Sequence, residues 1–84
     1  MSDLNKVLLI GRLTADPSNA GGYCCLFVRT STPDAVTHQV LVDGVKAKRC
    51  LEHLKAQRLV YIEGTLQDSG HIKATMVTFL GEKQ

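Results

Sequence analysis

This chain of 84 residues has no tryptophan, and its other aromatic side chains are few: two tyrosines and two phenylalanines. It also has no large excess of charge, because ten lysines and arginines nearly balance eight acidic residues, which leaves a net charge of +2. A uniformly polycationic protein is therefore excluded, and any affinity for a polyanion must come from local clusters of cations. With 44% hydrophobic residues the chain is globular. At this length we expect a single domain over residues 1–84.

The sequence has no long apolar run and no targeting segment. Its start, MSDLNKVLLIG, places an aspartate and an asparagine before a short apolar stretch. That stretch is too short to span a membrane, and it lacks the charged region that begins a signal peptide. We therefore expect a cytoplasmic protein without a membrane partner.

The three cysteines, Cys24, Cys25 and Cys50, form no CxxC pair. Adjacent residues of a strand point to opposite faces, so Cys24 and Cys25 cannot readily bind one ion. We expect free thiols and no metal, with Cys24 facing the core, Cys25 facing away and reacting first, and Cys50 on the buried side of a helix. The sequence also has no glycine-rich phosphate loop, no His-x-Glu motif and no spacing typical of a nucleophile and its base. We therefore expect that this protein is not an enzyme, that it has no catalytic residue and that it binds no cofactor.

The hydrophobic pattern predicts five strands and one helix. Residues 4–14 carry apolar side chains at odd and even positions, which is typical of a strand buried on both faces. Period-two alternation over 23–31 and 37–44 predicts a hairpin with one face in the core. The remaining predicted segments are a loop over 15–22, a helix over 45–57 with its apolar stripe on Val45, Cys50, Leu51 and Leu54, strands over 59–66 and 72–80, and a frayed end over 81–84.

This order of elements is that of the OB-fold, a small five-stranded barrel whose second and third strands bind oligonucleotides or oligosaccharides. We therefore predict an all-β fold with one helix between strands three and four, and a core over residues 4–80. A five-stranded barrel with a different winding is the alternative that the pattern leaves open.

Four segments occur in a characteristic order: LNKVLLIGRLTADP (4–17), CLFVRTST (25–32), HQVLVDG (38–44) and LVYIEGTL (59–66). Together they resemble the single-stranded DNA-binding proteins of bacteria and phages, and VYIEG resembles the fourth-strand signature of that family. The resemblance implies an OB barrel that binds single-stranded DNA without sequence preference in replication, recombination or repair. It also implies a homodimer or homotetramer built largely on strand one.

The chain departs from this family in several ways. The family commonly stacks bases on tryptophans and a phenylalanine, whereas Thr37 and Asp43 stand here where aromatic residues are expected. The connections at 32–36 and 67–71 are short. This sequence lacks the acidic C-terminal tail with which typical members of the family recruit replication and repair proteins. Replication proteins are possible partners, but we therefore do not assign the replication partners of the family to this chain. Because each stacked base is worth about 1–3 kcal/mol, we expect weakened binding.

Phe27 and Arg29 share one side of the second predicted strand, where an aromatic ring beside a cation suits a base and its phosphate. The alternative for Phe27 is to cap the barrel or to fill a subunit interface. Tyr23 lies on the same side. The other candidate phosphate contacts are Lys6, Arg12, Lys46 and Lys73, for which the alternative is an ordinary solvated cation.

For Tyr61 we expect packing, and for His38 a structural or interface role. His53 and His71 have no evident partner. The function that this sequence favours is non-catalytic binding of single-stranded DNA. The rival is an OB-fold module of a replication-restart or mobile-element protein that binds mainly other proteins, and the missing tryptophans and short loops favour that rival.

Overall fold

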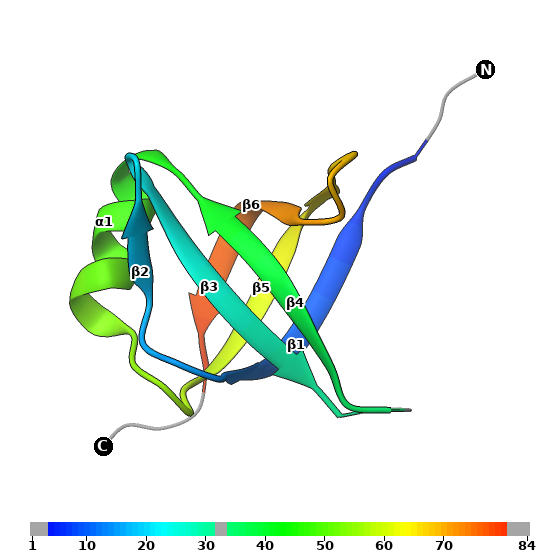
Figure 1. Ribbon diagram of the computed structural model, residues 1–84, viewed down its shortest axis with the longest axis horizontal. Coiled ribbons are helices and arrows are strands. Elements are labelled where there is room, and N and C mark those ends of the chain that lie inside the picture. Colours follow the sequence, from blue (N-terminus) through cyan, green and yellow to red (C-terminus); the bar gives the residue numbers. More distant parts are fainter. Residues whose placement is uncertain (1–3, 32–33, 81–84) are drawn as a thin grey trace.

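The computed structural model describes residues 4–31 and 34–80, so the predicted frayed end over 81–84 lies outside the described residues. The elements are β1 (Val7–Leu13), β2 (Ser18–Ala20), β3 (Tyr23–Thr30), β4 (Val36–Val42), α1 (Gly44–His53), β5 (Leu59–Leu66) and β6 (Ile72–Phe79). The strands wrap into a barrel, and α1 lies beside it, in contact with β3 (Figure 1).

Five strands close this barrel. The pairs β1–β5, β5–β6 and β3–β4 are antiparallel, while β4 pairs with β6 in parallel. A short antiparallel pairing of β1 with β3 completes the ring β1-β3-β4-β6-β5. The helix follows β4 and precedes β5, which are the third and fourth strands of the barrel. This topology is the OB-fold and confirms the predicted fold class.

β2 is a sixth strand that lies inside the segment we predicted to be a loop. Its residues, Ser18–Ala20, pair with residues 23–25 at the start of β3. Gly21 and Gly22 form the turn with φ of 61° and 92°, values that glycine adopts without steric cost. The backbone N–H of Gly22 also donates to Oδ1 of Asn19 (3.3 Å). The loop prediction is wrong for these three residues, because Gly21 and Gly22 form a tight hairpin turn that lets Ser18–Ala20 pair with β3.

β1 changes its partner along its length. Residues Val7 to Arg12 pair with β5, whereas Arg12 and Leu13 pair with β3. Gly11 lies at this crossing, where a Cβ atom would collide with the carbonyl oxygen of Arg29. A side chain is therefore excluded at the point where the barrel closes.

The two faces of β1 differ in burial. Val7 and Leu9 pack against the core, but Leu8 and Ile10 are 56% and 59% exposed. The prediction of a strand buried on both faces is thus wrong for the single chain, because none of the described residues covers the outward face of these two side chains.

The helix is shorter than predicted and buries a different stripe. Ala47, Cys50 and Leu54 follow an i, i+3, i+7 spacing and enter the core, while Val45 is 79% exposed and Leu51 is 37% exposed. The predicted stripe was therefore wrong at Val45 and Leu51, since the helical face that enters the core begins at Ala47 and neither residue lies on it.

The helix ends at His53 instead of residue 57 because other parts of the chain take the next backbone donors. The N–H of Ala56 donates to Oδ1 of Asp16 (2.8 Å), and the N–H of Gln57 donates to the carbonyl of Leu13 (2.8 Å). Gln57 adopts a left-handed conformation with φ of 76°. The end of the helix is thus tied to β1 and to the loop that follows it.

Candidate functional site

The outward surface of β3 and β4 carries the aromatic residues of the predicted site. Tyr23 and Phe27 are each 41% exposed, four residues apart on β3. Phe27 lies opposite Gln39 of β4, and the exposed Arg29 lies opposite Thr37. Tyr23, Phe27 and Arg29 therefore form one row along the outside of β3, as the alternation predicted.

Arg12 joins this row from the other side of β3. It is the register partner of Arg29 in the short β1–β3 pairing, and both side chains are exposed. Nη1 of Arg12 donates to the backbone carbonyl of Gln57 (3.0 Å). Phe27, Arg29 and Arg12 are thus contiguous on the barrel surface, although Arg12 is distant from the other two in sequence.

Lys73 lies on the far side of β4 from this row. It is the register partner of Leu41 in the parallel β4–β6 pairing, and Leu41 lies opposite Cys25 of β3. Its Nζ atom lies 4.0 Å from Oδ2 of Asp43. Lys73 therefore flanks the row, and the carboxylate of Asp43 partly offsets its positive charge.

The structure does not bring Lys6 to this row. Nζ of Lys6 lies 3.6 Å from Oε2 of Glu63 on β5, an oxygen that also accepts a hydrogen bond from the Tyr61 hydroxyl (3.1 Å). Partial desolvation and the Glu63 carboxylate raise the pKa of Tyr61. Tyr61 is half-buried and alternates with the core residues Val60 and Ile62, so its expected packing role stays a prediction.

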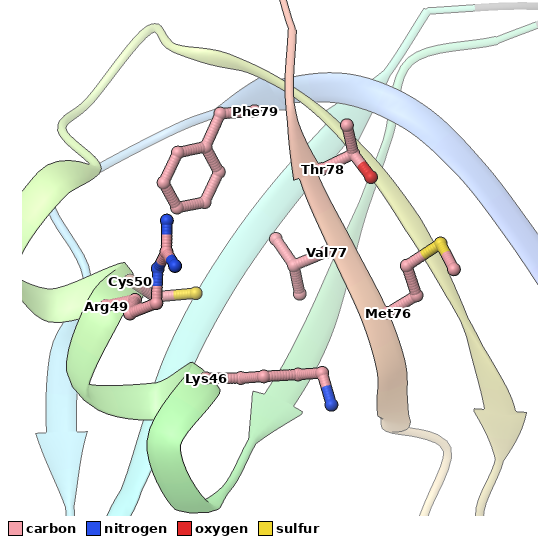
Figure 2. Close-up of a pocket in the computed structure, with 7 residues that line it drawn as sticks. All are labelled: Lys46, Arg49, Cys50, Met76, Val77, Thr78 and Phe79. Carbon is pink, nitrogen blue, oxygen red and sulfur yellow. The ribbon is translucent and has the colours of Figure 1, made fainter.

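Lys46 belongs to a separate groove between α1 and β6. This groove has a volume of about 390 Å³ and is lined by Lys46, Arg49, Cys50 and residues 76–79. Figure 2 shows the Arg49 side chain pointing toward the ring of Phe79, while Lys46 extends past Val77. Lys46 therefore lies on α1, facing β6, and does not belong to the row on β3 that contains Phe27.

All three cysteines are free and buried. Cys24 and Cys50 lie in the core, where burial raises the pKa of Cys24 to about 12 and also raises that of Cys50. Cys25 stands outside the core cluster but is only 6% exposed, because Gln39 covers it with Nε2 at 3.5 Å from Sγ. Its side chain does face away from the core, and at 6% it is still more exposed than Cys24 and Cys50, so the expectation that Cys25 reacts first stays a prediction, with a slow rate.

The histidines make local contacts. Nε2 of His38 lies 3.3 Å from Oγ1 of Thr30, and His38 is half-buried on β4, in keeping with the structural role that we expected. His53 lies 3.9 Å from the carboxylate of Glu52, and His71 contacts the hydroxyl of Ser69. The prediction that His53 and His71 have no partner is wrong, because both find one on a near neighbour in sequence.

Two residues of this surface were missed in the sequence. Gln57 and Gln39 are polar residues without a motif, and their importance depends on contacts with Arg12 and Cys25. The only available signal for Gln39 was its predicted place opposite the second strand. No signal pointed to the left-handed conformation of Gln57.

Within residues 4–31 and 34–80, no three histidine, cysteine or acidic side chains are arranged to hold a metal ion. In the same part of the chain, α1 is far too short to cross a membrane, and no other helix reaches the necessary length and apolarity.

At the sequence level, no family model and no curated protein matches this chain. Solved structures do match it. A deletion mutant of the single-stranded DNA-binding protein from Thermus aquaticus superposes with a TM-score of 0.83 at 21% identity, covering 96% of this chain and 43% of that one. The mitochondrial single-stranded DNA-binding protein of S. cerevisiae superposes with a TM-score of 0.84 at 15% identity, covering 98% of this chain and 100% of that one. This chain thus spans less than half of the Thermus aquaticus chain, and its fold is that of bacterial and mitochondrial single-stranded DNA-binding proteins.

Proposed function

We propose that this protein binds single-stranded DNA without sequence preference through the outward row of β3. The observation that carries the proposal is the exposed ring of Phe27 beside Arg29, on the strands with which an OB-fold meets its ligands. The likeness in fold to two single-stranded DNA-binding proteins supports it. The row and its neighbours perform no chemistry in this role.

Binding combines stacking with contacts to phosphates. Every base has a π-face, so the rings of Phe27 and Tyr23 accept any sequence, and each stacked base contributes about 1–3 kcal/mol. Arg29 and Arg12 neutralise phosphates and release counterions, which makes affinity depend on salt. With two exposed rings on β3 and no tryptophan in the sequence, the affinity per nucleotide is modest.

The other candidates rank by position. Lys73 flanks the row and attracts the strand electrostatically, but its nearby Asp43 reduces that contribution. Lys6, with Glu63 at 3.6 Å, and Lys46, on the helix, lie outside the row, and we assign them no direct role in the first contact with DNA.

The assembly that we propose is a homodimer or homotetramer built on β1. On one edge, β1 pairs with β3 only at Arg12 and Leu13 within the described residues, so its earlier part presents an unpaired edge. Proteins normally cover such an edge, and the exposed Leu8 and Ile10 supply an apolar surface for a second copy. We place this assembly in the cytoplasm, in replication, recombination or repair.

The test is a fluorescence titration of labelled oligo-dT with the wild type and with Phe27→Ala. We expect Phe27→Ala to weaken binding by about 1–3 kcal/mol with an unchanged dependence on salt, since a ring releases no counterions. Met76→Ala is the matched control, because Met76 is similarly exposed, at 45%, but lies on β6. This control should bind like the wild type.

Absence of wild-type binding to a long oligonucleotide at low salt would sink the proposal. The protein-interaction module would then take its place, as it would if Phe27→Ala broke the oligomer without a separate effect on DNA.

A further inference from the structure

The closing point of the barrel concentrates positive charge. Arg12 and Arg29 are direct register partners, and both point outward because their neighbours Leu13 and Val28 are buried. Like charges directly opposite each other on neighbouring strands destabilise the pairing. The ion pairs found among the described residues involve neither arginine. The repulsion is therefore not relieved by a carboxylate in this part of the chain.

The backbone orients one of the two guanidinium groups. The hydrogen bond from Arg12 Nη1 to the carbonyl of Gln57 (3.0 Å) fixes the direction of that side chain but does not neutralise its charge. Gln57 itself is held at φ of 76° by its bond to the Leu13 carbonyl. A residue with a side chain rarely adopts this conformation, and such strain is often kept at ligand sites.

Both arginines line one groove of about 600 Å³ at the β1–β3 seam. The hydroxyl-bearing residues Thr14 and Ser31 also line it, and none of the described lining residues is acidic. Each guanidinium offers five N–H donors in a planar fork, of which Arg12 spends one on Gln57. The groove is therefore rich in donors and suits an oxyanion.

We propose that Arg12 and Arg29 bind one and the same phosphodiester group of the bound strand, and that Gln57 is the positioning residue for Arg12. A single phosphate between the two guanidinium groups removes their repulsion and accepts hydrogen bonds from both forks. Arg29 lies two residues from Phe27, about 7 Å along the strand, so this phosphate belongs to a nucleotide at or next to the base stacked on Phe27. The inference rests on the proposed binding of single-stranded DNA.

The test compares oligo-dT affinity over a range of salt for the wild type, Arg12→Ala, Arg29→Ala and the double variant. Loss of one phosphate contact flattens the plot of log affinity against log salt by about 0.7 for single strands. If one phosphate is shared, the slope of this plot for the double variant is flatter than the wild-type slope by about 0.7 in total. The fold-loss of affinity of the double variant is then smaller than the product of the two single fold-losses. A loss of about 1.4 with multiplying affinity losses, or no change in slope, would overturn the shared site.

Three controls separate this result from trivial causes. Lys48→Ala removes an exposed charge from α1 and should leave binding unchanged. Arg12→Lys keeps the positive charge but loses the planar set of guanidinium donors. The affinity for DNA should therefore fall while its dependence on salt stays unchanged. Without DNA, the midpoint temperature of thermal unfolding of Arg29→Ala should equal or exceed that of the wild type, because the repulsion between Arg12 and Arg29 is relieved. If wild type itself fails to bind, the proposed function fails, whereas failure of the slope test alone removes only the shared phosphate.

The role of Gln57 is tested by its dependence on Arg12. A β-branched residue is strained at φ of 76°, so Gln57→Val should move the carbonyl and weaken binding when Arg12 is present but not in Arg12→Ala. Gln57→Gly suits that φ, keeps the carbonyl and should bind like the wild type. Equal weakening by Gln57→Val in both backgrounds would contradict the positioning role.

Discussion

At the scale of the residue, a side chain of the neighbouring strand limits the exposure of the Cys25 thiol. Gln39 lies two residues along β4 from Leu41, the register partner of Cys25, and its amide covers the sulfur. Cys24 is inert for a different reason, since burial raises its pKa to about 12 and thiolate is the reactive form. Alternation along a strand gave the directions of Cys24 and Cys25, but it gave no information on what covers an outward side chain.

We therefore predict that Gln39→Ala accelerates modification of Cys25 by a thiol reagent severalfold at neutral pH, because it removes the cover. Mass spectrometry of the native protein would locate the label, with Cys24 and Cys50 staying unlabelled. Thr37→Ala, on the same side of β4 but opposite Arg29, is the matched control and should leave the labelling rate unchanged. Labelling of Cys24 before Cys25 in Gln39→Ala would contradict this interpretation.

At the scale of the element, β1 depends on the absence of a side chain at Gly11. We predict that Gly11→Ala lowers the free energy of unfolding by about 1–3 kcal/mol, since the added methyl meets the backbone of β3 and forces the strands apart. Urea denaturation monitored by circular dichroism measures the change.

The comparison variant for Gly11→Ala is Gly22→Ala, whose methyl group meets open space, so its cost comes only from φ of 92°. Because no other backbone is displaced there, its effect should stay local to the β2–β3 turn. Wild-type stability of Gly11→Ala would show that the strands at the crossing have room to separate.

The sequence predicted elements well where alternation was strong and poorly where distant contacts decide. The strands over 23–31, 59–66 and 72–80 were found within about a residue. The first alternates between core and surface, and the run over 59–66 is rich in β-branched and aromatic residues and ends at a turn cluster. β2 was missed because three exposed residues carry no pattern, and it exists through pairing with β3. The end of α1 was misplaced because Asp16, far away in sequence, takes a donor that the helix would need.

For the candidate site, strand periodicity was enough to place Tyr23, Phe27 and Arg29 in one row. It could not join Arg12 to that row, because their adjacency depends on the closure of the barrel. Lys6 was named for its charge and its place in the LNKV segment, and Lys46 for its charge on a predicted helix. That Lys6 lies beside Glu63 and that Lys46 faces a groove against β6 follow from tertiary structure.

At the scale of the whole molecule, we predict a mass of two or four chains in light scattering at tens of micromolar protein. Ile10→Lys should reduce this mass, because it places a charge in the apolar surface of β1 that we assign to a second copy. Val45→Lys changes a residue that is even more exposed, but on α1, and should leave the mass unchanged. A sharp monomer mass for the wild type would exclude assembly through β1.

The two short pairings that close the barrel divide it into two halves. β2, β3 and β4 form one half, and β1, β5 and β6 form the other, each with long ladders inside it. The ladders between the halves are β1–β3 and β4–β6, with two residue pairs each. We therefore expect local opening of the sheet to begin at one of these seams, where the halves part while the hairpins stay intact.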